Sequence, residues 1–183
     1  MAGIIRKALD DAERADFSAM LRQARRSAVH LELRDSYGIA GEVEEFAEFL
    51  RTGHVDTDPE SEGWSGWVAQ IRKAVTRGVV VRRARIVSEP VTDYIRYEHA
   101  GTVVNLAAGE QVRWLPRRQA SDIALPGNDF WLFDETVVRF NHFTGDGGSA
   151  GPTLTDDPAV AELCAAAFEA VWERGIPHEK YTV

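Results

Sequence analysis

Residues 78–90 read Gly78-Val79-Val80-Val81-Arg82-Arg83-Ala84-Arg85-Ile86-Val87-Ser88-Glu89-Pro90, and this stretch decides the fold. Its β-branched residues, uninterrupted by glycine or proline from Val79 to Val87, predict a buried strand. Because successive side chains of a strand point to opposite faces, Arg82 should lie on one face and Arg83 with Arg85 on the other. The three arginines therefore do not form one basic surface.

Helices are predicted on both sides of this strand, wherever apolar residues recur three or four positions apart. The first predicted helix ends near Arg26, the second runs from Val43 to Leu50 and is closed by Gly53, and the third runs from Trp64 to Val75 and is capped by Ser65. A short helix starts at Ser88-Glu89-Pro90, with Tyr94 and Ile95 on its inner side. A long helix is predicted near the C-terminus. The C-terminal helix has the clearest signals, with Asp157 as N-cap, Pro158 in the first position and Gly175 after the end. Its buried face should hold Val160, Leu163, Cys164, Ala167, Phe168 and Val171.

Strands are predicted where apolar and polar residues alternate or where β-branched residues cluster. Besides residues 79–87, they are Val29–Leu33, Gln111–Leu115, Phe130–Phe133, Val137–Phe143 and Pro152–Leu154, the last two joined as a hairpin through Gly145-Asp146-Gly147-Gly148. Because helices and strands alternate, we expect an α/β (or α+β) fold, a mixed β-sheet flanked by helices with a long amphipathic C-terminal helix. Residues 1–183 should form a single domain, with 1–15 as a flexible N-terminal extension and 175–183 as a C-terminal tail.

The composition is that of an ordinary folded protein. Of the 183 residues, 44% are hydrophobic and 27% are charged, which excludes an intrinsically disordered chain. The single cysteine, Cys164, excludes a disulfide framework and a cysteine-rich zinc site. Charged residues soon after Met1 leave no apolar core for a signal peptide, and no apolar run approaches the ~20 residues of a membrane span. We therefore expect a cytoplasmic protein with no membrane partner.

Charge is distributed unevenly along the chain, whose formal net charge is −8. Residues 41–63 are mostly acidic and carry Glu42, Glu44, Glu45, Glu48, Asp56, Asp58, Glu60 and Glu62. Residues 71–97 are mostly basic and carry Arg72, Lys73, Arg77, Arg82, Arg83, Arg85 and Arg96. The two stretches either pair within one fold or face different partners. The net negative charge argues against direct nucleic-acid binding, because phosphates favour clustered positive charge.

Complete catalytic or metal-binding motifs are not found in the sequence. Gly63-Trp64-Ser65-Gly66-Trp67 has tryptophan where a nucleophile elbow needs its second glycine, and the glycine-rich residues 145–151 lack the lysine of a phosphate-binding loop. Phosphodiesterases of the phospholipase D type need two H-x-K motifs, and only His178-Glu179-Lys180 has this spacing. The five histidines are scattered, so neither a metal nor another cofactor is predicted. These gaps favour a protein that is not an enzyme.

One polar cluster surrounds the start of the predicted short helix. It contains the acidic residues Glu89, Asp93 and Glu98, the basic residues Arg85 and Arg96, and Tyr94 between them. Such a set at a strand-to-helix junction forms either a polar ligand pocket or a buried ion-pair network.

Four segments resemble an uncharacterised actinobacterial domain family that is often encoded beside WhiJ-type helix-turn-helix regulators. They are Phe17–Tyr37, Arg85–Glu98, Ala108–Arg113 and Asp129–Asp134, and their order and spacing extend the resemblance over about residues 16 to 174. The sequence follows the family pattern at Arg34, Tyr37, Arg85, Glu89, Pro90, Tyr94, Arg96, Gly109, Glu110, Trp131 and Asp134. The final strands and helix are also distantly similar to phospholipase D-like domains. The missing paired H-x-K motifs fit a sensor or adaptor better than a hydrolase.

This resemblance implies a small cytoplasmic α/β domain associated with gene regulation or with specialised-metabolite gene clusters. Our leading hypothesis is a non-catalytic regulatory or adaptor domain that binds a partner protein, a DNA-binding helix-turn-helix regulator. The partner-binding candidates are the acidic residues Glu42, Glu44, Glu45 and Glu48, which would contact a basic partner. Association as a homodimer is a further expectation.

The alternative is a small-molecule sensor, or a small enzyme of specialised metabolism, that uses Arg85, Glu89, Tyr94, Arg96 and Glu98. The arginines would hold a small anionic ligand, and Glu89 or Glu98 would act as acid or base. The full set of ligand-binding candidates is Arg34, Tyr37, Arg85, Glu89, Tyr94, Arg96, Glu98, Glu110 and Asp134.

Overall fold

The computed structural model describes residues 17–38 and 40–183. The helices are α2 (Phe17–Gln23), α3 (Val43–Thr52), α4 (Ser65–Thr76), α5 (Asp93–Ala108) and α6 (Pro158–Arg174). The strands are β1 (Ser27–Glu32), β2 (Val80–Val87), β3 (Gln111–Pro116), β4 (Asp129–Phe133), β5 (Val137–Phe143), β6 (Ser149–Thr155) and β7 (Ile176–Pro177). Short 3-10 helices are η1 (Ala40–Glu42), η2 (Arg117–Ala120) and η3 (His178–Lys180).

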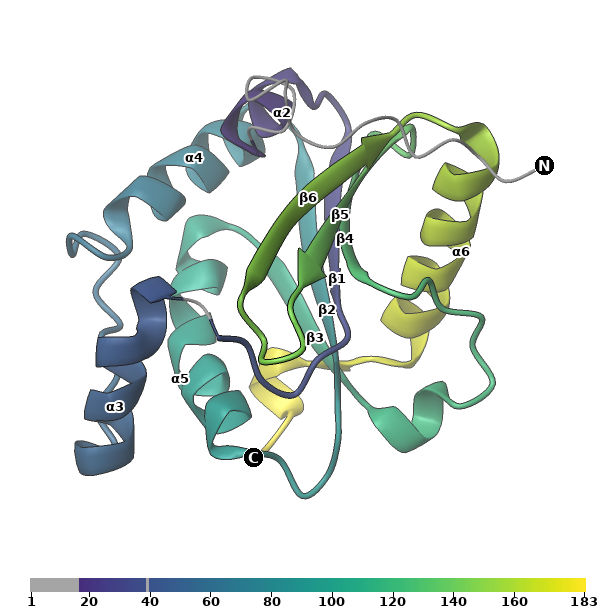
Figure 1. Ribbon diagram of the computed structural model, residues 1–183. Helices are drawn as coiled ribbons and strands as arrows, with labels where there is room; N and C mark the ends of the chain where they lie inside the picture. The colour runs from purple at the N-terminus through teal and green to yellow at the C-terminus, as the bar shows by residue number, and fades with distance from the viewer. Residues whose placement is uncertain (1–16, 39) are drawn as a thin grey trace.

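The strands form one seven-stranded mixed sheet in the order β6-β5-β4-β1-β2-β3-β7. The central strands β1, β2 and β3 are parallel neighbours, whereas β4, β5 and β6 on one side and β7 on the other are antiparallel. Parallel strands need crossover connections. Here α3 and α4 connect β1 to β2, and α5 connects β2 to β3. The predicted α/β domain, with its mixed sheet and long C-terminal helix, is confirmed (Figure 1).

Helices cover both faces of the sheet, so the central strands are buried from two sides (Figure 1). On one face, α6 packs its Phe168 into a core with Leu31 and Ile86. On the other face, α2 and α4 pack against Val81 and Trp131. Helix α5 covers the neighbouring part of that face, and α3 lies farther out, against α5 (Figure 1). The α4–α5 face is the one that contains the candidate site.

The arginines of β2 divide between the two faces as the strand alternation predicts. Arg82 points toward α6, where its Nη2 lies 2.5 Å from Oε1 of Glu169 and its guanidinium covers the ring of Trp172 at 5.2 Å. Arg83 and Arg85 point to the opposite face, toward α5. The prediction that these arginines do not share one surface is therefore confirmed.

The helix after β2 differs from its prediction in both start and length. It begins at Asp93 and runs for 16 residues to Ala108. Its N-cap is Thr92, whose Oγ1 accepts a hydrogen bond from the backbone N–H of Ile95 at 3.1 Å. Pro90 lies outside the helix. The predicted start and length of this helix are therefore wrong, because the Ser88 hydroxyl hydrogen-bonds with Asp35 and Arg117 and does not cap a helix.

Other predicted boundaries need smaller corrections. Ser65 is the first residue of α4 and makes no capping hydrogen bond, since Trp64 holds the N-cap position. The first described helix ends at Gln23, earlier than Arg26. On α6, Leu163 is 44% exposed and Ala161 is buried, so the buried stripe is rotated slightly from its predicted position. The predicted β5–β6 hairpin and the Asp157 N-cap of α6 are confirmed.

The C-terminal residues pack against the sheet. Strand β7 pairs with β3, and Tyr181 after it is only 5% exposed. The predicted N-terminal extension, residues 1–15, lies outside the described residues. Across the residues that the structure describes, none of the helices has the length and apolar character needed to span a bilayer.

Candidate functional site

A cavity of about 380 Å³ opens on the α4–α5 face of the sheet. This volume is within the range of small-molecule sites, roughly 300–1,000 Å³. Most of its walls come from β1, β2, α4, α5 and the segment from η1 into α3. The lining residues are His30, Glu32, Tyr37, Gly41, Glu42, Glu45, Gly63, Trp64, Trp67, Arg83, Arg85, Tyr94, Tyr97, Glu98, Gly101, Asn105, Asp129, Asn141 and Phe143.

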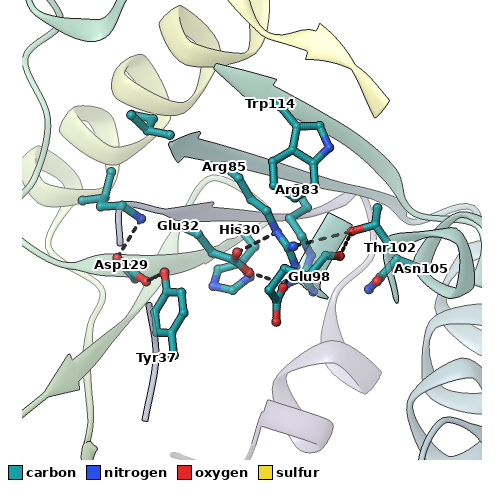
Figure 2. Close-up of polar contacts among 12 residues, drawn as sticks. His30, Glu32, Tyr37, Arg83, Arg85, Glu98, Thr102, Asn105, Trp114 and Asp129 are labelled. Carbon is teal, nitrogen blue, oxygen red and sulfur yellow. Dashed lines mark hydrogen bonds and ion pairs between the residues drawn. The ribbon is translucent and has the colours of Figure 1, made fainter. Parts of the chain in front are cut away.

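Glu32 lines the cavity and pairs with two arginines, Arg83 and Arg85 (Figure 2). Its Oε1 pairs with Nη1 of Arg83, and its Oε2 lies 2.7 Å from Nε of Arg85. The three residues are only 8%, 8% and 5% exposed. Burial alone would raise the pKa of Glu32, but the two adjacent guanidiniums outweigh burial and lower it. The carboxylate is therefore charged at neutral pH.

Two further carboxylates complete the pairing of these arginines. Glu98 on α5 lies 2.5 Å from Nη2 of Arg85. Glu110 lies 3.0 Å from Nε of Arg83 and is itself held by the side chains of Trp67 and Asn105, each at 2.9 Å. Both guanidiniums thus have carboxylate partners, which is the arrangement that buried charges require.

Strand register explains why these groups meet. In the parallel β1–β2 pair, His30 is opposite Arg83 and Glu32 is opposite Arg85. In the same way, Arg85 is opposite Trp114 of β3, and its guanidinium covers that indole at 4.9 Å. Side chains opposite one another on one face are close enough to interact. The charged cluster therefore follows from the pairing of three strands.

His30 shares this face without forming a hydrogen bond. Its ring stacks on Trp131 with the ring centroids 4.3 Å apart. Its Nδ1 lies 3.2 Å from Oε1 of Glu32, yet among the described residues neither ring nitrogen has a hydrogen-bond partner of acceptable geometry. Burial lowers the pKa of His30 well below its usual range, an effect that the neighbouring Glu32 only partly offsets. The ring is therefore neutral at pH 7.

The wall formed by η1, α3 and α5 carries surplus negative charge. The hydroxyl of Tyr94 lies 2.5 Å from Oε2 of Glu42 and 3.2 Å from Oε1 of Glu98, and it has one proton to donate. Burial, followed by the charge of Glu98, raises the pKa of Glu42 to about 7. Next to this group, the hydroxyl of Tyr97 donates to Glu45 at 2.9 Å.

Asp129 forms a second acidic point on the β4 side of the cavity. Its Oδ1 accepts from the backbone N–H of Leu33 at 2.9 Å, and its Oδ2 accepts from the hydroxyl of Tyr37. Burial raises the pKa of Asp129 to about 6, and the charge of Glu32 adds to this effect. Asp129 therefore stays largely ionised at pH 7, and Tyr37 is fixed in the cavity wall.

The structure brings about half of the sequence-predicted candidates together. Tyr37, Arg85, Tyr94 and Glu98 line the cavity, as do Glu42 and Glu45, which were candidates for partner binding. Glu110 lies directly behind the cavity, where it pairs with Arg83. The predicted polar cluster is thus in part a ligand-sized pocket and in part a buried ion-pair network.

The remaining candidates lie elsewhere. Glu89 accepts a hydrogen bond from Tyr181 at 2.9 Å, and Arg96 pairs with Asp93 on the exposed side of α5. Asp134 accepts from the backbone N–H groups of residues 25–27 and so holds the start of β1. Arg34 lies outside the cavity lining, with its guanidinium over the ring of Phe143 at 5.2 Å. Glu44 is exposed on α3, and Glu48 pairs there with Arg51.

Sequence reasoning missed Glu32, His30, Arg83 and Asp129 as site residues. The alternation of His30 and Glu32 with apolar residues was visible in the sequence, but it is equally typical of a solvated strand face. Only the pairing of β1 with β2 reveals that these positions face two arginines inside the protein.

The single H-x-K motif is also outside the cavity lining. His178 is 8% exposed, accepts a hydrogen bond from Trp114 Nε1 at 3.2 Å and stacks on His99. Lys180 is exposed in the short helix η3. Within residues 17–38 and 40–183, no three histidine, cysteine or acidic side chains are arranged to hold a metal ion.

Comparison with known proteins identifies a family and a fold. The sequence model of a family described as "Domain of unknown function (DUF6879)" matches residues 15–183. The structure is similar to that of a phospholipase D family member, Nuc from Salmonella typhimurium, with a TM-score of 0.51 and 14% identity over 87% of this chain and 86% of that one. It is also similar to NucT from Helicobacter pylori, with a TM-score of 0.50 and 13% identity over 93% and 96% of the two chains. The search of curated proteins found no match.

The raised pKa of Glu42 predicts a pH-dependent effect of Glu42→Gln. Between the ordinary value of 4.5 and about 7, the folded protein keeps a proton on Glu42 that the unfolded chain has released, so this group's contribution to stability falls as pH rises. Glutamine mimics the protonated form. We expect the variant to melt roughly 2–4 °C above wild type at pH 8, which corresponds to about 1 kcal/mol for a chain of this size, and close to wild type at pH 4.5.

Differential scanning fluorimetry at both pH values measures this effect. Glu162→Gln, which removes an exposed carboxylate from α6 on the opposite face of the sheet, is the matched control. An equal difference between Glu42→Gln and wild type at both pH values would contradict the assignment.

Proposed function

The chain belongs to the DUF6879 family, a domain family of unknown function, and we propose that it is a non-catalytic sensor domain whose cavity binds a small molecule. The observation that carries this proposal is the cavity itself. It is large enough for a small ligand and has aromatic walls. Polar side chains from four separate parts of the chain line it. Such a combination is typical of ligand sites.

The state of the charged groups favours binding over chemistry. Arg83 and Arg85 would be the natural groups to hold a phosphate or another anion. Each is already engaged by two carboxylates, so neither is free to stabilise charge that develops on a substrate. The only H-x-K sequence lies at the C-terminus, packed on His99 and Trp114. The likeness to Nuc, a phospholipase D family member, therefore supports a shared fold, on which we infer that the cavity of this chain binds a ligand without catalysis.

The proposal predicts that a solute is retained by the wild-type protein and lost when the cavity is filled. Gly41 lines the cavity, and a Cβ there would meet nothing within 4 Å, so Gly41→Trp adds an indole at the mouth with no backbone clash. Ala166→Trp, at an exposed position on α6, is the matched control.

Each protein is exposed to a bacterial metabolite extract, desalted and denatured, and the released solutes are identified by mass spectrometry. We expect wild type and Ala166→Trp to release the same solute in near-stoichiometric amount, and Gly41→Trp to release less than a tenth as much. Equal release from Gly41→Trp and wild type would contradict binding in this cavity.

A second candidate function is the binding of a regulator protein of the helix-turn-helix type through the outer side of α3. Support comes from the exposure of this helix, where Val43 and Leu50 are 60% and 56% exposed next to the carboxylate of Glu44. Exposed apolar residues bordered by charge are typical of protein-binding surfaces. In this function, Glu44 and Glu48 would contact the partner, while Glu42 and Glu45 line the cavity.

Charge reversal distinguishes this second function. Glu44→Lys with Glu48→Lys should reduce capture of a co-encoded helix-turn-helix protein at least tenfold in a pulldown. Glu162→Lys with Glu173→Lys changes the net charge equally on α6 and should leave capture unchanged. Equal capture by all three proteins would remove α3 as the docking surface.

A further inference from the structure

We propose that the ligand of the cavity is a small organic cation, an aliphatic amine whose ammonium group binds between Glu42 and Glu98. This inference rests on the proposed function, ligand binding in the cavity, and specifies the chemical class of the ligand. It differs from the anionic ligand that the sequence suggested. Three features of the cavity carry it: its charge balance, a shared tyrosine proton and its aromatic walls.

The charge balance of the cavity is negative. Its lining includes five carboxylates, Glu32, Glu42, Glu45, Glu98 and Asp129, and two guanidiniums, Arg83 and Arg85. Both guanidiniums are occupied by Glu32, Glu98 and Glu110. An anion entering the cavity would meet committed cations and additional negative charge, whereas a cation would reduce the excess.

The excess is greatest at the wall formed by η1, α3 and α5. On the β4 side, which carries Asp129, two more arginines are present. The guanidinium of Arg34 lies over the ring of Phe143, and Arg139 donates a hydrogen bond to the side chain of Asn141. On the opposite wall, Glu42 and Glu45 are paired only with tyrosine hydroxyls among the contacts of the described residues. The ammonium group is therefore placed at this wall.

The hydroxyl of Tyr94 marks the binding point. It lies 2.5 Å from Glu42 and 3.2 Å from Glu98, and with one proton it can donate to only one of these carboxylates at a time. An ammonium group has three donors and a full positive charge, so it can satisfy both carboxylates together. In its absence, a proton held on Glu42 fulfils the same need, which agrees with the raised pKa of that carboxyl.

The walls suit an organic cation in both size and surface. Trp64, Trp67, Tyr94 and Tyr97 line the cavity. Aromatic faces attract cations and also bury alkyl chains. Because a water molecule occupies roughly 30 Å³ of liquid, the cavity has room for an amine with several carbon atoms, and far more room than a single metal ion would use.

His30 contributes a neutral ring to the floor of the cavity. The side chain is more than nine-tenths buried, and among the described residues neither of its ring nitrogens has a hydrogen-bond partner. Its Nδ1 is the nitrogen nearer Glu32, at 3.2 Å from Oε1, so in the neutral ring the N–H belongs on this side and Nε2 carries the lone pair. Both ring nitrogens are covered by protein atoms, so His30 adds no positive charge and no direct ligand contact to the floor.

Titration with simple probes at pH 8 and low salt tests the proposal. Trp64 and Trp67 line the cavity, so their fluorescence reports occupancy, and calorimetry gives the affinity. The probes are 1,4-diaminobutane, its neutral isostere 1,4-butanediol, the dianion succinate, and calcium chloride. We expect 1,4-diaminobutane to bind at least tenfold more tightly than any of the others. Equal binding of the diamine and the diol, or tighter binding of calcium, would overturn the proposal.

Isosteric variants locate the ammonium group. Glu42→Gln and Glu98→Gln should each weaken diamine binding at least tenfold, whereas Glu162→Gln on the opposite face should bind like wild type. Glu98 also pairs with Arg85, so its variant could lose stability. Among the contacts of the described residues, Glu42 makes no ion pair with Arg83 or Arg85. The affinity of Glu42→Gln for the diamine is therefore the decisive measurement of where the ammonium group binds. Unchanged affinity in Glu42→Gln would overturn the proposal.

The probes also separate this inference from the proposed function. Binding of succinate or butanediol that is at least as tight as diamine binding, and that Gly41→Trp abolishes, would overturn the cationic ligand and leave the cavity as a binding site. If the diamine binds equally to wild type and Gly41→Trp, its site is elsewhere and the inference fails. The solute-retention measurement then decides independently whether the cavity binds any ligand.

Discussion

The carboxylate of Glu32 lies between the guanidiniums of Arg83 and Arg85 at the centre of the sheet, and much of the structure depends on this contact. Charges this deeply buried are tolerated only when paired, so the contact and the register of β1 against β2 depend on each other. The same arginines reach outward to Glu98 and Glu110, and through them they position α5 and the indole of Trp67 on α4. The cavity is the space that these fixed groups leave between the sheet and the helices.

Once the arginines are satisfied, the other carboxylates around the cavity are in excess, and this excess gives the site its chemical character. Glu42 and Glu98 share the proton of a single tyrosine hydroxyl, and the neutral ring of His30 has no hydrogen-bond partner of its own among the described residues. An ammonium group would satisfy the two carboxylates together. The fold is shared with Nuc, a phospholipase D family member, and with NucT at 14% and 13% identity, and one fold can carry different site chemistry.

Local sequence pattern was sufficient to predict most of the helices and strands, and it identified the α5 side of the candidate site. The alternation in residues 79–87 correctly separated Arg82 from Arg83 and Arg85, and the caps of α6 were visible in the sequence. The placement of Glu89 and Arg96 in one cluster failed because the helix starts at Asp93, which turns Arg96 outward while Tyr94 and Glu98 face in. His30, Glu32 and Asp129 could not be recognised, because they become site residues only when distant strands pair.

A double-mutant cycle on Glu32 and Arg85 tests most directly whether this buried pairing organises the structure. Glu32→Gln, Arg85→Gln and the double variant would be unfolded in urea and compared with wild type. We expect each single change to cost up to about 3–5 kcal/mol, because it removes one of the two oppositely charged partners of a buried charge. The double change should cost less than the sum by more than about 2 kcal/mol, well beyond the range of independent sites. Costs that add within about 0.5 kcal/mol would contradict the account.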